Sequence, residues 1–81
     1  MTIAIDRPVV QFSPARLREA RHAAGLTQRA LGLAVDRTNT QVAYWERGTY
    51  VPTIEALCRL VQVLGVPVDA LFEREAAGSA S

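Results

Sequence analysis

The side chains best suited to specific hydrogen bonding stand between positions 38 and 47, in the run TNTQVAYWER. At about 100° per helical residue, Val42, Trp45 and Glu46 fall on one side of a helix. The opposite side carries Thr40, Gln41, Ala43, Tyr44 and Arg47. Hydroxyl, amide and guanidinium groups are the ones that bind base edges in a DNA major groove, where glutamine pairs with adenine through two hydrogen bonds. A solvated helix face usually carries Lys and Glu pairs, which this face lacks, so the pattern favours a DNA-reading helix.

The start of this helix is marked by Thr38, whose hydroxyl can accept a backbone N–H at a helix N-terminus. Gln41, three positions later, completes the sequence of a capping box. The helix is therefore predicted to begin at Thr38. Gln41 then has two possible uses, because its amide can bond to its own backbone or to DNA.

A second short helix must support the reading helix. Thr27 can cap a helix from Gln28 to about Ala34, whose expected buried side consists of Ala30, Leu31, Ala34 and Val35. Two turns of helix are not stable alone in water. This helix must therefore pack on the reading helix across a turn at Asp36-Arg37.

An earlier helix is predicted from Ser13-Pro14, a cap followed by a proline at the first helical position, to about Ala24. Leu17, Ala20, Arg21 and Ala24 share one face of it. Because an unpaired buried charge is very costly, Arg21 on this apolar face needs a partner. Glu46, on the inward side of the reading helix, is the candidate, so we interpret Arg21 as structural and not as a DNA contact.

Beyond the reading helix, Thr53 caps a fourth helix from Ile54 to about Leu64, with a buried stripe of Leu57, Leu60, Val61 and Leu64. Cys58 flanks this stripe and is expected to be a half-buried, inert thiol. Residues 66–72 are predicted to begin a short fifth helix, and residues 73–81 to form a frayed tail.

The first twelve residues are interpreted as an N-terminal arm. Residues 2–5 and 9–12 each resemble a strand and are separated by Asp6-Arg7-Pro8. A hairpin is one possibility, but an isolated two-stranded hairpin is marginal in water. We favour an extended arm that docks on this domain or on a partner subunit. The expected organisation is an arm over 1–12, an all-α domain of five helices over 13–74, and a flexible tail over 75–81.

Composition narrows the function classes. The chain has 81 residues, nine arginines, no lysine and a net charge of only +1, so a nucleic-acid-binding face must be a local arrangement of arginines. A single cysteine excludes an internal disulfide and a cysteine-based zinc site, and no metal or cofactor is expected. No apolar run reaches the ~18 residues of a membrane span, and the start lacks a signal peptide's pattern, so a cytoplasmic location is expected.

The residues from Leu17 to Phe72 resemble the phage-repressor-like helix-turn-helix regulators, also called the XRE or Cro/C1 type. The matching pattern is Arg21, Gly25-Leu26-Thr27-Gln28, Leu31, Val42, Glu46-Arg47-Gly48, Pro52, Leu57, Leu64-Gly65-Val66 and Leu71-Phe72. Two positions depart from the family pattern. Asp36 replaces a common glycine in the turn, where Asp tolerates left-handed backbone angles better than most residues. Trp45 replaces a smaller aliphatic residue and should make a bulkier core contact.

The resemblance implies specific roles in DNA binding. The implied base-reading residues are Asn39, Thr40, Gln41 and Tyr44. The implied phosphate contacts are Gln28, Arg29, Arg37, Thr38, Arg47, Gly48, Thr49 and Tyr50, and Gln28 should also brace the reading helix. The resemblance also implies the Arg21–Glu46 pair. Phosphate contacts position a protein on DNA, whereas base contacts specify the sequence.

One such domain makes too few base contacts for a unique site, so we expect a homodimer on a palindromic operator. The candidate dimer surface consists of Val66, Val68, Leu71 and Phe72; these residues alternatively only complete the monomer core. The alternative function is an antitoxin-like or regulatory protein-binding module, whose arm docks on a partner through Ile3, Ile5, Val9 and Val10. An enzyme is not expected, because no catalytic set of residues is present. Repression and activation are equally compatible with the sequence.

Overall fold

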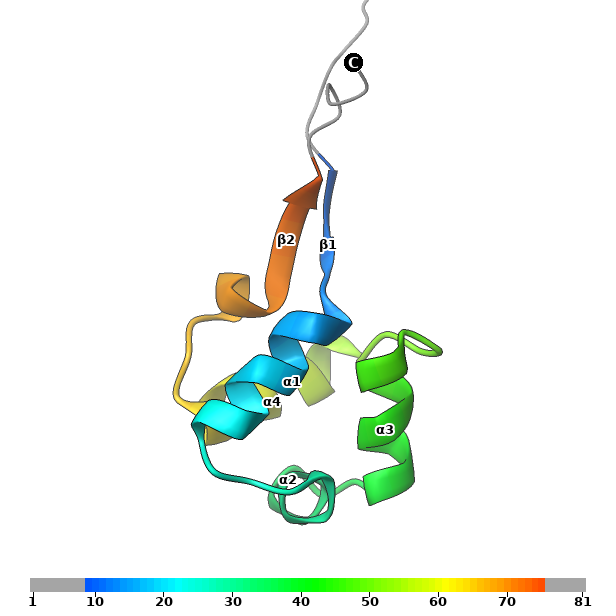
Figure 1. The fold of residues 1–81 in the computed structure, drawn as a ribbon, viewed down its shortest axis with the longest axis vertical. Coiled ribbons are helices and arrows are strands. Elements are labelled where there is room, and N and C mark those ends of the chain that lie inside the picture. Colours follow the sequence, from blue (N-terminus) through cyan, green and yellow to red (C-terminus); the bar gives the residue numbers. More distant parts are fainter. Residues whose placement is uncertain (1–8, 76–81) are drawn as a thin grey trace, which may run out of the picture.

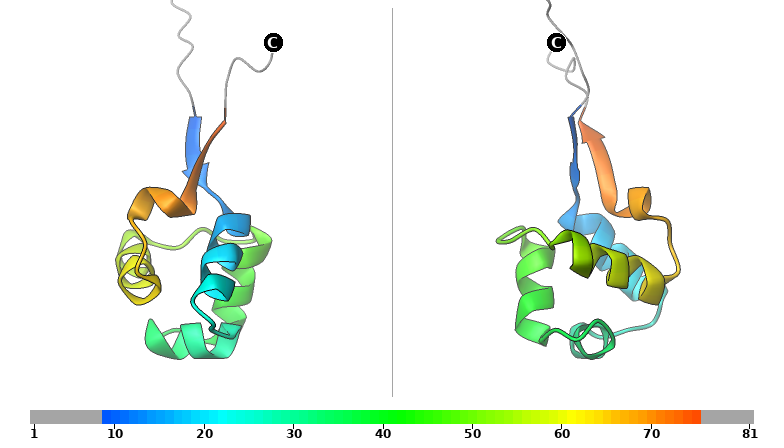
Figure 2. Two further views of the ribbon diagram at one scale, coloured as in Figure 1. Left: turned by 60° about the vertical axis from the view of Figure 1, so that its left-hand side comes forward. Right: turned by 180° about the vertical axis from the view of Figure 1, so that it is seen from behind.

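The computed structural model describes residues 9–75. In chain order the elements are β1 (Val9–Phe12), α1 (Pro14–Ala23), α2 (Gln28–Ala34), α3 (Asn39–Arg47), α4 (Ile54–Leu64), the 3-10 turn η1 (Val68–Leu71) and β2 (Phe72–Glu75). Figure 1 shows α1, α2, α3 and α4 gathered into one body, from which β1 and β2 rise side by side. The views in Figure 2 show the same two-stranded ribbon extending from one end of the body, away from α2.

Hydroxyl caps begin all four helices where the sequence predicts them. The side chains of Ser13, Thr27, Thr38 and Thr53 accept hydrogen bonds from the backbone N–H three residues later, at 3.0 to 3.2 Å. Each such bond satisfies one of the backbone donors that a helix N-terminus leaves without an intrahelical partner. The predicted starts of these four helices, and the approximate ends predicted for α1, α2 and α4, are therefore confirmed.

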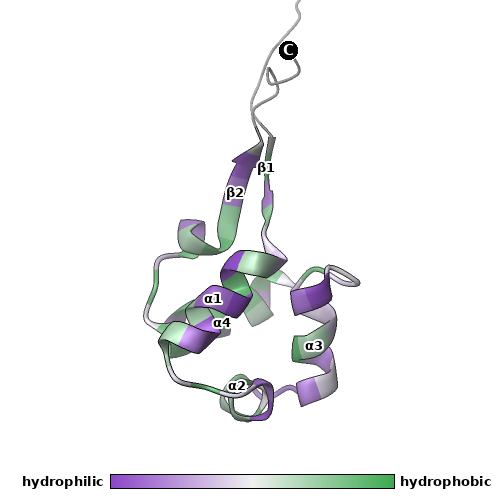
Figure 3. Ribbon diagram, viewed as in Figure 1, coloured by the Kyte–Doolittle hydropathy of each residue, from purple (hydrophilic) through white to green (hydrophobic). Residues whose placement is uncertain are grey.

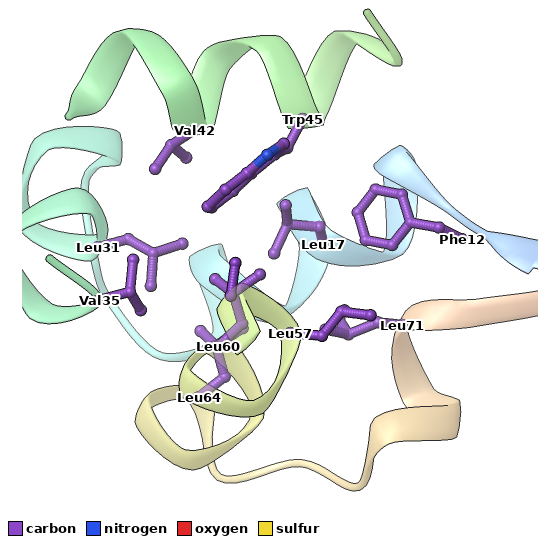
Figure 4. Close-up of a cluster of buried hydrophobic side chains, with 11 residues drawn as sticks. Phe12, Leu17, Leu31, Val35, Val42, Trp45, Leu57, Leu60, Leu64 and Leu71 are labelled. Atoms are coloured by element: carbon purple, nitrogen blue, oxygen red, sulfur yellow. The ribbon is translucent and has the colours of Figure 1, made fainter. Parts of the chain in front are cut away.

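The core lies where the four helices meet. Figure 4 shows Trp45 extending from α3 toward Leu17 of α1, with Leu60 and Leu64 entering from α4. Trp45 is almost fully buried, and Leu17, Leu31 and Leu60 are completely so. The predicted bulky core contact of Trp45 is therefore confirmed.

The predicted fifth helix is wrong. Its residues form only the single turn η1, which Pro67 precedes in an extended conformation, and the chain becomes extended again at Phe72 (φ −121°, ψ 152°). The residues that follow are strand β2, whose outer part is hydrophilic in Figure 3. Over residues 9–75 the fold is therefore four helices with a small two-stranded sheet, and not five helices.

Strand β2 pairs with β1 in antiparallel register, from Phe12 opposite Phe72 to Val9 opposite Glu75. The rings of Phe12 and Phe72 pack edge to face with centroids 6.1 Å apart, and the Ser13 N–H donates to the Leu71 carbonyl at 2.8 Å. Residues 73–75 are thus paired and not frayed, which corrects that prediction. The alternative strand at 2–5, and Ile3 and Ile5 as partner contacts, lie outside the described residues. The division of the chain into arm, domain and tail stays a prediction. Within the described residues, the last part of the predicted arm lies in β1 and the first residue of the predicted tail lies in β2.

Ala34 and Cys58 are more exposed than predicted, and Ala30 and Val61, expected in buried stripes, are only partly buried. Ala34 is exposed, because the buried arc of α2 runs from Leu31 through Val35 to Gly32 and leaves Ala34 on the other side. Cys58 is exposed, because the buried stripe of α4 includes Ala56 and lies away from the position of the thiol. None of the helices in residues 9–75 has the length and apolar character needed to cross a membrane.

Candidate nucleic-acid interface

The turn between α2 and α3 is held by close backbone contact. The Arg37 N–H donates to the Gly32 carbonyl at 2.7 Å, and a Cβ atom at position 32 would lie 2.9 Å from the backbone carbonyl of Thr38. Between these residues Asp36 adopts φ 63°, the left-handed conformation anticipated for it. The turn therefore fixes where α3 begins relative to α2.

The inward side of α3 is anchored by a buried ion pair. Arg21 Nε donates to Glu46 Oε2 at 2.6 Å and Nη2 donates to Oε1 at 3.0 Å, the two-bond geometry typical of a strong arginine–carboxylate contact. The third arginine nitrogen, Nη1, donates to the Leu26 carbonyl at 2.9 Å. Arg21 is only 8% exposed and Glu46 only 4%, so α1 and α3 are joined through a water-excluded contact.

Gln28 extends this network to α2. Its side-chain amide donates to Glu46 Oε1 at 3.1 Å, which joins the first residue of α2 to the inward side of α3. Every buried side-chain nitrogen and oxygen in the described part of the chain has a hydrogen-bond partner. The charges in the network are therefore compensated, and they hold α3 on the body from two neighbouring helices.

The outward side of α3 keeps its polar groups near the surface. Asn39, Thr40 and Arg47 are exposed, and Gln41 and Tyr44 are half-buried. The Gln41 backbone N–H donates to Thr38 Oγ1 at 3.1 Å. Within residues 9–75, however, the Thr38 backbone N–H donates no hydrogen bond to the Gln41 side chain, so only half of the expected capping box forms. The Gln41 amide is thus not engaged by its own helix terminus.

Tyr44 contacts two neighbours, Arg47 one turn later on α3 and Tyr50 in the following loop, and helical periodicity predicts only the first. The guanidinium carbon of Arg47 lies 5.2 Å from the centroid of the Tyr44 ring. The ring of Tyr50 meets the same ring edge to face, with centroids 5.3 Å apart and planes at 75°. The backbone brings Tyr50 there because Gly48 is left-handed (φ 80°) and the Thr49 N–H donates to the Tyr44 carbonyl at 2.9 Å. The only sequence signal for this contact is the glycine that follows the helix.

The residues implied as phosphate contacts are distributed around α3. Arg29 is exposed on α2, Arg37 and Thr38 stand at the start of α3, and residues 47–50 stand at its end. Arg37 also approaches α4, with Nη2 3.9 Å from Glu55 Oε1. The residues implied as phosphate contacts therefore lie at both ends of α3 and on α2.

The four residues of the candidate dimer surface differ in their exposure to solvent. Val68 is 52% exposed, and Val66 and Phe72 are partly buried. Leu71 is completely buried in the core. Its side chain is not available to a partner, so Leu71 is removed from the candidate dimer surface.

Comparison with known proteins identifies the type of domain. The family model described as "Helix-turn-helix domain" matches residues 15–76, most of the chain. Among solved structures, the P22 c2 repressor, in complex with a synthetic operator, superposes with a TM-score of 0.70 at 33% identity, over 75% of this chain and 92% of that one. No curated protein matches the chain by sequence.

Two further solved structures match this chain about equally well but belong to proteins of different kinds. The restriction-modification controller protein C.AhdI from Aeromonas hydrophila gives a TM-score of 0.68 at 29% identity, over 72% of this chain and 88% of that one. The hydroxypropylphosphonic acid epoxidase from S. wedmorenis gives 0.68 at 30% identity, over 74% of this chain but only 32% of the enzyme.

A four-helix body that anchors an outward polar helix by a buried ion pair, together with these matches, defines a helix-turn-helix domain. Within that class the chain belongs to the phage-repressor-like DNA-binding regulators of the Cro/C1 or XRE type.

Proposed function

We propose that this protein is a sequence-specific transcriptional regulator that binds double-stranded DNA by inserting α3 into the major groove. One observation carries the proposal: α3 is fixed to the body by the Arg21–Glu46–Gln28 network on one side and presents amide and hydroxyl groups on the other. Rigid support of the side chains that contact bases limits the conformational cost of binding. The proposal assigns no catalytic activity to the chain.

Base reading is assigned to Asn39, Thr40, Gln41 and Tyr44, which occupy the outward side and the start of α3. Phosphate binding is assigned to Gln28, Arg29, Arg37, Thr38, Arg47, Gly48, Thr49 and Tyr50. Because the net charge of the chain is only +1, affinity depends on this local set and not on a general attraction to polyanions.

The protein acts as a two-fold homodimer on a palindrome in this proposal. Two copies double the number of base contacts, and each good two-bond contact contributes about 1–3 kcal/mol of discrimination. The proposed dimer surface consists of Val66, Val68 and Phe72, of which Val68 is the most exposed. The P22 c2 repressor, a structural relative, is itself an operator-binding protein.

Selection of duplexes from a random library by the purified protein, at ~0.15 M salt, tests the proposal. The expected product is a palindrome with half-sites about 34 Å, or one helical turn, apart. Recovery of duplexes without a common motif would contradict sequence-specific reading.

The dimer is tested separately by sedimentation of the protein with and without the selected duplex. Val68→Asp is expected to weaken self-association, whereas the exposed Val63→Asp on α4 serves as a control outside the assigned surface. A strict monomer at high micromolar concentration, which also binds the operator as one copy, would contradict the dimer.

A further inference from the structure

We infer that Tyr50, in the loop after α3, is a positioning residue for base recognition, which acts by holding the Tyr44 ring in a groove-facing orientation. This inference rests on the proposed function. It differs from the phosphate contact that the resemblance implies for Tyr50, because here the aromatic ring of Tyr50 acts on Tyr44 and not on the DNA backbone.

The contact geometry supports the inference from both partners. Tyr44 stands on the outward side of α3, yet it is half-buried, while Tyr50 remains 58% exposed. The two rings meet edge to face at 5.3 Å, an arrangement that aromatic side chains prefer over a parallel sandwich. Tyr50 therefore covers part of Tyr44 while contributing little to the hydrophobic core.

Arg47 limits the movement of the Tyr44 ring further. Its guanidinium carbon lies 5.2 Å from the ring centroid, within the range of cation–π attraction. With Tyr50 at the ring as well, the tyrosine has two neighbours that oppose rotation away from its observed position. A side chain ordered before binding loses less conformational entropy when it reaches a base.

The backbone of the loop fixes the position of Tyr50 beside Tyr44. Gly48 turns the chain at φ 80°, and the Thr49 N–H bonds to the Tyr44 carbonyl at 2.9 Å. Position 50 is thereby brought back along the end of the helix that carries its partner ring. The loop thus links the end of α3 to the orientation of a residue one turn earlier.

The test compares Tyr50→Ala and Tyr50→Phe with Tyr44→Ala and the double variant Tyr44→Ala/Tyr50→Ala. Val51→Ala serves as the matched control, because Val51 is a neighbouring exposed loop residue without a ring contact to Tyr44. Affinities are measured at fixed salt for the operator selected by the unaltered protein and for operators with single base-pair substitutions. The positions at which Tyr44→Ala loses preference define the bases that Tyr44 specifies.

Tyr50→Ala is expected to reduce the preference at those same positions by roughly two- to tenfold, the range that an edge-to-face aromatic pair supports. Tyr50→Phe keeps the ring and should keep the preference. In the Tyr44→Ala background, Tyr50→Ala should cause no further loss of preference. The unfolding midpoint should fall only slightly in the variants that lose the ring contact and stay unchanged in Tyr50→Phe and Val51→Ala. The Tyr44 ring-proton shifts of the DNA-free protein should move in Tyr50→Ala only.

Three outcomes would overturn the inference while leaving the proposed function intact. Tyr50→Ala and Tyr50→Phe could weaken binding to all operators equally, which would make the Tyr50 hydroxyl a phosphate contact. Tyr50→Ala could leave every preference unchanged, or Tyr44→Ala could itself retain full preference. If the unaltered protein shows no sequence preference, the proposed function fails and this inference fails with it.

Discussion

The two sides of α3 use their polar groups in opposite ways. On the inward side, Glu46 accepts bonds from Arg21 and Gln28 in a buried environment, so its hydrogen-bonding capacity is used within the fold. On the outward side, Asn39 and Thr40 stay exposed. The two faces of this nine-residue helix therefore have different roles. The inward face contributes to stability, and the outward face contributes to the proposed DNA recognition. Changes on one side should alter folding, and changes on the other should alter DNA binding.

Glu46→Ala should have the largest effect and should fall on stability. It leaves Arg21 buried without its carboxylate, and breaking a buried ion pair by removal of one partner costs about 3–5 kcal/mol. Urea unfolding monitored by circular dichroism measures the loss. Glu19→Ala is the control, since Glu19 is exposed on α1 and surface changes usually stay within about 0.5 kcal/mol. Equal midpoints for the two variants would contradict a supporting role for the inward side.

Gly32→Ala should destabilise the contact between α2 and α3. Helix propensity alone predicts that this change stabilises by about 1 kcal/mol. The added Cβ would, however, lie 2.9 Å from the Thr38 backbone, which cannot move aside as a flexible side chain would. We expect a net loss of about 1–3 kcal/mol, measured by thermal unfolding. A higher midpoint than that of the unaltered protein would show that the helices separate without cost.

On the outward side, Tyr44→Ala and Arg29→Ala should have different effects on DNA binding. Tyr44→Ala should relax sequence preference with little change in salt dependence. Arg29→Ala should weaken binding to all duplexes and lower the salt slope by about one unit. Fluorescence anisotropy titrations at several salt concentrations distinguish the two. Identical behaviour of both variants would refute the division into base-reading and phosphate-binding residues.

Asp36→Gly should have the smallest effect, a gain of between zero and about 1 kcal/mol in stability. The left-handed angle at position 36 strains aspartate slightly and does not strain glycine. A β-branched residue tolerates this angle poorly, so Asp36→Val should be less stable than the unaltered protein. If the two variants unfold at the same temperature, the turn is not held in this conformation.

Much of the helical part of the fold could be predicted, because its signals are local. Ser13, Thr27, Thr38 and Thr53 each mark a helix start within a few residues of the bonds that they form. The pairing of Arg21 with Glu46 was also predictable, because a charge on an apolar face requires a partner. These inferences needed only the preference for hydroxyl caps, helical periodicity and the cost of burying a charge.

The remaining features depend on contacts that are distant in sequence or on loop geometry. Strand β2 was missed because its partner β1 lies more than 50 residues earlier, and four residues such as FERE carry no strong strand pattern. The proximity of Tyr50 to Tyr44 depends on the turn at Gly48. The close approach at Gly32 depends on how α2 meets the start of α3. The roles of individual side chains in DNA binding are still predictions.

The pairing of β1 with β2 has a consequence for synthesis of the chain. Since Phe12 lies opposite Phe72 and Val9 opposite Glu75, the first strand has no partner until almost all of the described residues have been made. Contacts of such large sequence separation form slowly, because the intervening chain must first lose its freedom. On the ribosome, the helical body can therefore begin to fold before the ribbon closes. Completion of the domain must wait until β2 has left the exit tunnel.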